Sequence, residues 1–465
     1  MSTRFISIDH NQPLLLPPDL RDWIPDDDLV HFVIAAVNGL DLSVFRVNVT
    51  GSGSAQYPPH VMLSLLIYCY ANGVFSSRRI ERATYRDIAV RYLTGDTHPD
   101  HDTIAKFRRE NFDGVAACFV HVLELAQEMK LLRVGTVSVD GTKLKANASK
   151  NKNLRYDRAG QLIEQLDLEV RELMEQAESM DRGDEVDGQT LPDELAHRSK
   201  LKAKLEQARK HIEERAKRKA QSGQAEYERK IKEREQRNKP ISGRLPKKPD
   251  ATPEAKTQYN LTDPDSRLMR RNKYSSYEQS YNAQASVDAD GSQLVLSTHV
   301  SQRANDLHEL IPAILGIPES IGQPDTVLAD TGYLHEKQIR TLEGDGSTPN
   351  MNILVSVHAE AKRLRRKHDY RPLPTETKAP RAIHSKFVLE MKEKMERDAS
   401  REKYRLRKQT VEPVFGTIKK WMGFTQFQLR GHANVSTEWK LVALAYNMKR
   451  LWKMQNAPKQ AVSPG

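Results

Sequence analysis

The feature that most restricts the fold is a charged stretch at residues 150–275, which separates one strand pattern from all later strand patterns. Residues 136–141 are short, β-branched and alternating, and they predict a strand that ends at Asp140. The next strand patterns are at 281–287 and 294–299, where Asp290 and Gly291 signal a hairpin turn between them. A sheet that contains all three strands must therefore combine strands from before and after an insertion.

Further patterns follow the hairpin. They predict a helix at 306–315, an apolar strand that ends at Asp330, a helix at 335–342 and a strand at 352–357. This order describes a mixed sheet with helices on its faces. The sequence therefore predicts an α/β core split by a helical insertion.

Within the insertion, apolar residues recur at spacings of three and four. These heptad positions are Ile163, Leu166, Val170, Leu173, Ala177 and Met180, continued by Leu201, Leu205, Ala208 and Ile212 after a polar link at 181–189. An antiparallel helical hairpin is the simplest way to cover both stripes, although two copies of the chain could equally pair. Residues 223–264 are charged and contain prolines, which indicates a linker.

The first 130 residues have helical patterns. Asp26 to Asp28, Pro58 with Pro59, Ser76 or Ser77, and Asp102 or Thr103 are expected to start four helices. The third is expected to bury Ile80, Ala83, Ile88 and Leu93. Short helices with basic flanks are typical of DNA-docking modules, but many small helical domains share this pattern.

Positive charge is clustered along the chain. The sequence has 73 Lys and Arg against 62 Asp and Glu, a formal net charge of +11, and basic clusters at 202–248, 362–367 and 392–420. Such clusters indicate a polyanion such as nucleic acid, although a solvated helix face explains the first equally well because acids are interspersed.

Other features restrict the class of protein. No apolar run approaches the ~20 residues of a membrane span, and residues 1–9 lack a signal-peptide core. Cys69 and Cys118 have no metal-site spacing. We therefore expect a cytoplasmic, nucleoid-associated protein without a disulfide framework.

Three acidic residues stand out as candidate metal ligands. Asp140 and Asp330 end predicted strands, and Glu412 lies in a basic segment after the last strand. Carboxylates without His or Cys partners suit Mg²⁺, and two such ions stabilise both oxygens of a displacement at phosphorus. Each residue also has a structural explanation: a turn at Asp140, a helix cap at Asp330, and an exposed ion pair between Glu412 and Lys408.

The segment around Glu412 favours the functional interpretation. Tyr404, Lys408, Glu412 and Lys419 are spaced to lie near one face of a helix. This pattern resembles the Tyr–Arg–Glu–Lys signature of bacterial insertion-sequence transposases of the DDE class. Residues 139–142 are similar to the first Asp motif of that family, 328–333 to its second and 411–416 to its Glu motif.

The resemblance implies a ribonuclease-H-like mixed-sheet core interrupted by a helical-hairpin insertion and preceded by an all-α domain. It implies that Asp140, Asp330 and Glu412 hold two Mg²⁺ ions, with Mn²⁺ as a possible substitute, and that Tyr404, Arg407, Lys408 and Lys419 position DNA. The implied reaction is hydrolysis of a phosphodiester followed by strand transfer. The implied partners are the terminal inverted repeats of the element, target DNA and further copies of the chain in a homodimer or larger synaptic oligomer.

The sequence departs from the family signature at two positions. Lys408 stands where the signature has Arg, although Arg407 lies next to it. Pro413 follows Glu412 and predicts that the helix kinks or begins there. Trp421 and Phe424 follow, and we expect apolar core residues there in preference to a platform for an unpaired base.

The expected domains are a helical DNA-binding domain at 1–130, the first core strand at 131–150, the insertion and linker at 151–275, the rest of the core at 276–455 and a disordered tail at 456–465. Two other functions remain open: a catalytically inactive basic DNA-binding or scaffolding protein, and a metal-dependent nuclease without strand transfer.

Overall fold

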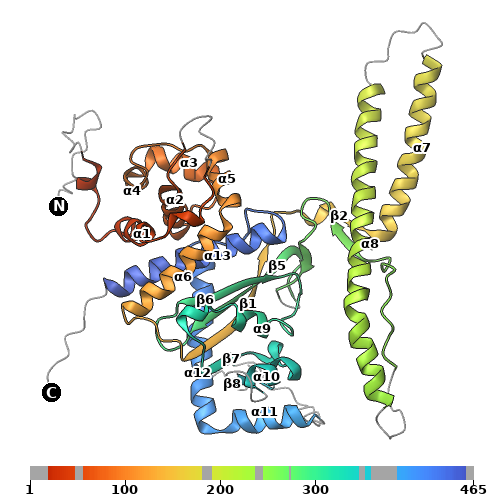
Figure 1. Ribbon diagram of the computed structural model, residues 1–465. Coiled ribbons are helices and arrows are strands. Elements are labelled where there is room, and N and C mark those ends of the chain that lie inside the picture. The colour runs from red at the N-terminus through yellow and green to blue at the C-terminus, as the bar shows by residue number, and fades with distance from the viewer. Residues whose placement is uncertain are drawn as a thin grey trace, which may run out of the picture. The chain divides into compact units, whose positions relative to one another are not determined.

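The structure is a computed structural model that describes residues 19–47, 56–180, 191–235, 245–271, 274–344, 351–357 and 385–456 (Figure 1). Two compact units divide the chain. One combines Met1–Leu144 with Asn282–Gly465, and the other is Lys145–Tyr281. The first unit contains the expected α/β core, and the second contains the insertion.

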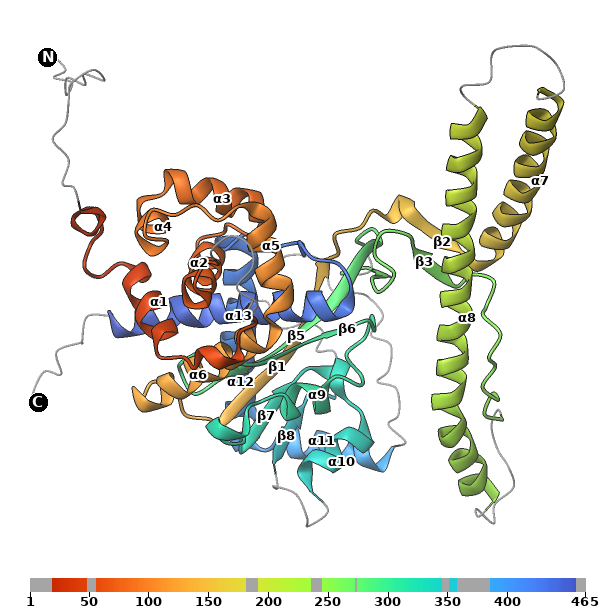
Figure 2. The same cartoon turned by 45° about the horizontal axis from the view of Figure 1, so that its top comes forward.

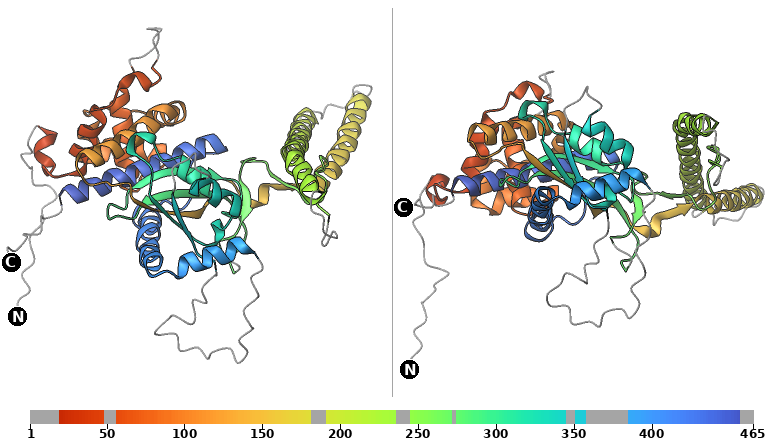
Figure 3. Two further views of the ribbon diagram at one scale, coloured as in Figure 1. Left: turned by 60° about the horizontal axis from the view of Figure 1, so that its bottom comes forward. Right: turned by 90° about the horizontal axis from the view of Figure 1, so that it is seen from below.

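The sheet of the first unit has the neighbour order β6, β5, β1, β7, β8. Its strands are β1 (Thr136–Lys145), β5 (Glu278–Asp288), β6 (Val295–Ser301), β7 (Thr326–Ala329) and β8 (Asn352–Val355). β1, β7 and β8 are parallel, whereas β5 and β6 form an antiparallel hairpin whose turn contains Gly291 at φ +124°. Helices lie on both faces of the sheet (Figure 3). This mixed α/β architecture is consistent with a ribonuclease-H-like core and confirms the fold class expected from the sequence.

Two core elements differ from their expected bounds. β1 does not end at Asp140 but continues to Lys145, so Asp140 lies in a strand and the turn interpretation is wrong. Backbone bonding continues the pairing beyond the strand, since Ala146 N donates to Gln279 O at 2.9 Å. The helix expected from 306 begins later, as α9 (Leu310–Leu315), because the side chain of Asp306 is bonded to β5.

The last helix, α13 (His432–Gln455), protects the exposed edge of β6. The Asn447 side chain accepts from Val295 N and donates to Val295 O, both at 2.8 Å, as a neighbouring strand would. His432 bonds to Val300 O at 2.7 Å. The helix therefore ends the sheet at β6 without a further strand.

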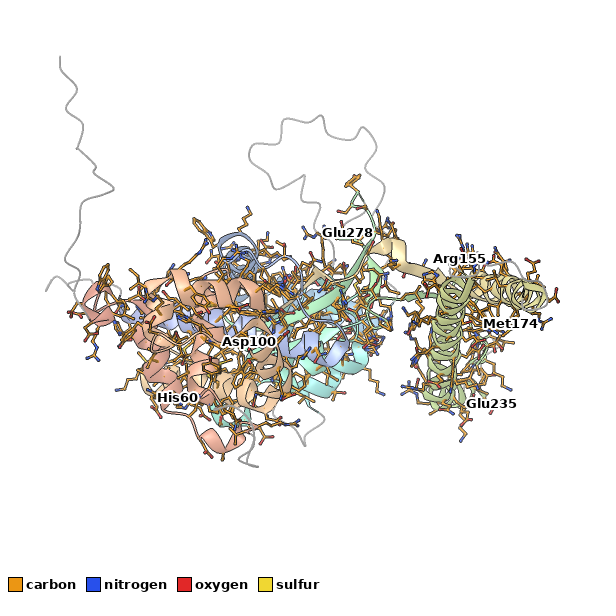
Figure 4. All side chains as sticks on the ribbon, turned by 90° about the horizontal axis from the view of Figure 1, so that it is seen from above. His60, Asp100, Arg155, Met174, Glu235 and Glu278 are labelled. Atoms are coloured by element: carbon orange, nitrogen blue, oxygen red, sulfur yellow. The ribbon has the colours of Figure 1, made fainter. Side chains whose placement is uncertain are left out.

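The N-terminal helices begin at the kinds of residue that the sequence predicted. They are α1 (Leu29–Asn38), α2 (Pro59–Ala71), α3 (Ser77–Arg86), α4 (Ile88–Leu93), α5 (His101–Glu110) and α6 (Phe112–Glu128). Asp28 caps α1 and Ser76 caps α3, but Asp100 caps α5 in place of the expected Asp102 or Thr103. Figure 4 labels Asp100 and also His60, which lies on α2.

The expected third helix is in fact two helices. Asp87 has extended backbone and its carboxylate accepts from Val90 N at 3.0 Å, which ends α3 and caps α4. Ile88, which the pattern placed on the buried side, is 36% exposed. A local side-chain bond therefore overrides the helical periodicity at this point.

A buried polar network joins these helices to α13. Arg108 on α5 donates to the Tyr70 hydroxyl at 2.8 Å and to Phe75 O at 2.9 Å, and Tyr70 donates to Glu438 at 3.1 Å. The other carboxylate oxygen of Glu438 accepts from the backbone N–H groups of residues 428 and 429. Burial raises the pKa of Glu438 in spite of the nearby charge of Arg108. The network is favourable only while both charged groups remain in place.

Replacing Arg108 with Ala should lower the free energy of unfolding by about 3–5 kcal/mol, because Glu438 would be left buried without its counter-charge. Urea unfolding followed by circular dichroism measures this loss. Arg109→Ala is the matched control, since Arg109 is exposed on the same helix. Equal stability of the two variants would show that the network does not hold the helices together.

The helix that carries Glu412 neither begins nor ends at Pro413. It is α12 (Asp398–Gly416), which continues into a π-helical turn at Thr417–Trp421. Proline has no N–H, so the carbonyl of Gln409, four residues earlier, loses its helical donor. The side chain of Gln293, in the β5–β6 turn, supplies a donor at 2.8 Å. The expectation that the helix begins at this proline is therefore wrong, because a residue from another element replaces the missing bond.

Gln293→Ala should destabilise the protein by about 1 kcal/mol, the usual net value of one hydrogen bond. Pro413→Ala restores the helical N–H, so the same Gln293→Ala substitution should cost much less in that background. Urea unfolding of the single and double variants measures the difference. If Gln293→Ala lowers the free energy of unfolding equally in both backgrounds, Gln293 does not replace the donor that Pro413 lacks.

The second unit contains the expected antiparallel hairpin (Figure 2). Helix α7 (Tyr156–Met180) packs on α8 (Leu191–Glu235) through Ile163, Leu166, Leu205, Ala208 and Ile212. Ion pairs join Asp167 to Lys202 and Glu169 to Arg198 across the two helices. At the start of α7, Tyr156 bonds to Glu213. Residues later in α7 therefore contact residues earlier in α8, as antiparallel packing requires. Figure 4 labels Met174 on α7 and Glu235 at the end of α8.

The segment expected to be a linker is partly ordered. Helix α8 extends twelve residues beyond Gly223, supported by the bond between Gln224 and Glu228 and the ion pair between Glu226 and Lys230. The strands β2 (Asn153–Arg155) and β3 (Gln258–Asn260) then pair antiparallel, and β4 (Arg267–Met269) pairs with the start of β5. A cavity of about 700 Å³ in this unit is lined by six cationic residues: Arg215, Lys219, Lys247, Lys248, Lys256 and Arg267.

Several expectations concern residues outside the described ranges. These are the N-terminal residues 1–9, the polar link 181–189, the basic cluster 362–367 and all but the first residue of the tail 456–465. Among the helices of the described ranges, none has the length and apolar character that crossing a membrane requires.

Candidate active site

The two candidate aspartates lie at the same level of neighbouring parallel strands. Ser138 on β1 is paired with Leu328 on β7, and each aspartate follows two residues later, Asp140 within β1 and Asp330 directly after β7. Parallel strands in register bring equivalent residues side by side. Two acids 190 positions apart in sequence thus meet at one place in the sheet.

Arg407, on α12, connects these two acids. Its Nη2 lies 2.8 Å from Asp140 Oδ2 and 3.9 Å from Asp330 Oδ2. The side chains of Arg407 and Asp140 are 10% and 18% exposed, whereas that of Asp330 is 43% exposed. One guanidinium therefore sits between a buried acid and a solvated acid.

The electrostatics of Asp140 are dominated by burial. Loss of hydration raises its pKa to about 7, against the attraction of Arg407, and the negative charges of Asp330 and Asp306 raise it further. Burial alone would lower the pKa of Arg407, but Asp140, Tyr404, Asp330 and Glu412 together raise it. Arg407 is thus held as a cation, and Asp140 is ionised only at some cost.

The structure confirms the helix-cap interpretation of Asp330 and leaves one of its carboxylate oxygens outside the cap. Its Oδ1 accepts from Gly332 N at 2.8 Å and caps the short helix Thr331–Tyr333, while Oδ2 faces Arg407. The cap fixes one carboxylate oxygen and leaves the other toward the centre. A capping role at this position therefore does not argue against a functional one.

Glu412 takes no part in the ion pairs that join Arg407 to Asp140 and Asp330. It lies on α12 five residues after Arg407, it is exposed, and its charge acts on Arg407. Within the described ranges no ion pair joins Glu412 to Lys408, and no three acidic, His or Cys side chains are close enough to hold a metal. The structure brings Asp140 and Asp330 together around Arg407, but it does not bring Glu412 into a closed ligand set.

The residues expected to position DNA divide into two groups. Tyr404 donates to Ala329 O at 3.0 Å, Lys419 donates to the hydroxyl of Thr142, and Arg407 is buried against the acids. These three therefore contact the strands that carry the aspartates. Lys408, which directly follows Arg407 on α12, is exposed to solvent.

The two aromatic residues after the Glu helix have different environments. Phe424 is fully buried against Phe75 and Trp439, as expected for a core residue. Trp421 is 88% exposed, so the core interpretation is wrong for it, because the π-helical turn directs it away from the interior. It borders a cavity of about 320 Å³ that is also lined by the cations Lys449, Arg450 and Lys453.

Sequence analysis missed three residues beside the aspartates. Asn282 and Gln284 on β5 both donate to Asp306 Oδ1 at 2.7 Å, beside the glycine that follows Asp140. The available signal was a pair of amides at alternate positions, next to the small residues Ala283 and Ala285 of a predicted strand, since buried amides need partners. Nothing in the sequence indicated which acid they would bind.

The donor chemistry of this centre fits a hard divalent cation. Asp140 and Asp330 offer carboxylate oxygens, the ligand type that Mg²⁺ and Mn²⁺ prefer, and the charge of Asp306 acts on Asp140, although the described residues hold no closed set of three such ligands. Arg407 is the cation that contacts Asp140 and Asp330, and its buried Nε has no hydrogen-bond acceptor in the described ranges. This N–H group can only donate, so what it lacks is an acceptor, such as an oxygen of a bound phosphate.

Comparison with known protein families agrees with this geometry. Residues 18–110 match the family described as a transposase domain (DUF772), and residues 251–448 match the family described as a transposase DDE domain. The second match contains Asp330, Arg407, Glu412 and Lys419, whereas Asp140 precedes it across the insertion. Neither the curated proteins nor the solved structures with which the chain was compared give a match.

An α/β core with paired acids on neighbouring parallel strands, matched by a DDE domain, defines an enzyme that acts on DNA. With a second transposase domain preceding that core, the chain belongs to the DDE-class insertion-sequence transposases.

Proposed function

We propose that this transposase cleaves DNA by metal-dependent phosphodiester hydrolysis at the ends of its insertion sequence and then transfers the freed strand to target DNA. The observation that carries the proposal is the convergence of Asp140 and Asp330 on Arg407, with Glu412 on the same helix as Arg407. We propose further that two or more copies of the chain hold the element ends together during the reaction.

Asp140, Asp330 and Glu412 would hold the divalent cations, Mg²⁺ or in its place Mn²⁺. When bound, such cations activate the attacking oxygen and neutralise charge on the phosphate. Asp140 is held rigidly by its strand and by Arg407, so it fixes the reaction centre in the sheet. Glu412 lies on α12 five residues after Arg407, and it would join the ligand set when the cations bind.

Arg407, Tyr404 and Lys419 would orient the scissile phosphate from the strand side, and Lys408 would contact the DNA backbone from the exposed side of α12. Arg407 offers a planar fork that can contact carboxylate and phosphate together. The exposed Trp421 is available to stack on an unpaired base near the cut.

Asp140→Asn and Glu412→Gln should each reduce strand cleavage at least 100-fold while DNA binding is retained, because each removes a charged oxygen at nearly constant shape. Cleavage of a plasmid that carries both element ends measures the rate, with added Mg²⁺ and after EDTA. Asp398→Asn is the matched control, since Asp398 is an exposed acid in the first turn of the same helix.

The products separate the proposal from its alternatives. A nuclease without strand transfer would release cut DNA but no joined molecules. A scaffolding protein would bind DNA equally well with EDTA and would not cut it. Full cleavage by Asp140→Asn would remove that residue from the reaction centre.

Lys408→Ala should weaken DNA binding and reduce the dependence of log K on log salt by roughly one unit, because one phosphate contact and its released counterion are lost. Fluorescence anisotropy with labelled duplex between 50 and 200 mM salt measures both quantities. Lys386→Ala is the control, an exposed lysine on the helix α11 (Lys386–Glu396). An unchanged slope for Lys408→Ala would exclude this residue from the contact surface.

A further inference from the structure

Asp306 lies in the loop between β6 and α9, beside both aspartate motifs. A side chain at Gly141, the residue after Asp140, would place its Cβ 2.8 Å from Asp306 Oδ1. A Cβ at Gly332, two residues after Asp330, would lie 3.6 Å from Asp306 Oδ2. The two glycines therefore make room for this carboxylate between the two motifs.

The position of Asp306 is fixed by a chain of buried side chains. Its Oδ1 accepts from Asn282 and Gln284, which are 1% and 0% exposed. The side-chain oxygen Oε1 of Gln284 accepts from the hydroxyl of Tyr333, which directs the side-chain nitrogen Nε2 toward Asp306. Tyr333 itself follows Asp330 by three residues. The second aspartate motif thus orients the amide that holds Asp306.

The electrostatics of this arrangement are unfavourable without a cation. Asp306 adds a third negative charge beside Asp140 and Asp330, while Arg407 supplies one positive charge. A merely structural hydrogen-bond acceptor at this position would serve equally well as a neutral amide or hydroxyl. Separately, the buried Nε of Arg407, a residue that is 8% exposed, has no acceptor in the described ranges, so the centre also has an unused donor for a bound ligand oxygen.

We propose that Asp306 is a fourth acidic residue of the reaction centre, a positioning residue that strengthens divalent-cation binding by Asp140 and Asp330. The two amides hold Oδ1 and leave Oδ2 directed toward the Asp330 motif. This inference rests on the proposed metal-dependent function and assigns to it a carboxylate outside the three-acid set.

Mn²⁺ binding to the metal-free full-length protein, measured by isothermal titration calorimetry without DNA, tests the inference independently of catalysis. Asp306→Asn keeps an oxygen for the two amide donors but removes the charge. It should weaken Mn²⁺ binding about 10–100-fold, as loss of a group that supports metal ligands usually does. In cleavage assays the half-saturating Mn²⁺ concentration should rise by a similar factor.

Asp288→Asn is the matched control because Asp288 is a buried acid on β5, the strand that carries Asn282 and Gln284, and it bonds to Ser292 and not to Asp306. It should leave Mn²⁺ affinity unchanged. Asp306→Ser, which retains an acceptor in a smaller side chain, decides the question if Asp306→Asn does not fold.

The outcomes distinguish this inference from the proposed function. If the wild-type protein does not bind Mn²⁺ and cleaves equally well in EDTA, the proposed function fails. If the wild-type protein binds Mn²⁺ and a folded uncharged variant at position 306 binds it with the same affinity, only the inference about Asp306 is overturned.

Discussion

The ion pair between Arg407 and Asp140 is the interaction on which the centre depends. Two carboxylates on adjacent parallel strands repel each other, and burial makes the charged form of Asp140 costly, so its pKa lies near 7. The guanidinium offsets part of that cost and contacts Asp330 at longer range. It also attaches α12, and with it Glu412, to the middle of the sheet. The same contact therefore organises the acids and the helix that approaches them.

Much of the surrounding structure holds α12 and α13 against the sheet. Gln293 replaces the helical donor that Pro413 lacks, so α12 continues through Glu412 and into the π-helical turn that exposes Trp421. Asn447 and Trp439 attach α13 to the backbone of β6 and β5. Glu438 then connects α13 to Tyr70 and Arg108 of the N-terminal helices. Side-chain bonds to backbone recur at each junction, since backbone groups at strand edges and near proline have no regular partners.

Prediction from sequence succeeded where the signal was local and periodic. The helix caps at Asp28 and Ser76 and the hairpin turn at Gly291 lie where their patterns placed them. The heptad pattern also predicted the buried contacts of α7 with α8, at Ile163, Leu166, Leu205, Ala208 and Ile212, but it was wrong for Leu201, which is 37% exposed. Prediction failed where a side-chain bond or a strand pairing that the periodic pattern does not record changed the outcome. Asp87 divided a helix, Gln293 carried a helix past proline, and pairing with β5 extended β1 beyond Asp140.

The sequence by itself determined the order of elements and the chemical type of the centre, because strand periodicity, the acids at 140 and 330 and the basic helix around 412 are properties of short segments. Tertiary structure alone decided which groups meet. It set β1 beside β7 in a register that aligns the two aspartates, turned Arg407 inward while Lys408 remained exposed, and brought Asp306 between the two motifs. These contacts depend on strand pairing and packing between residues far apart in sequence, such as Asp140 and Arg407, which are separated by 267 positions, and no local pattern records them.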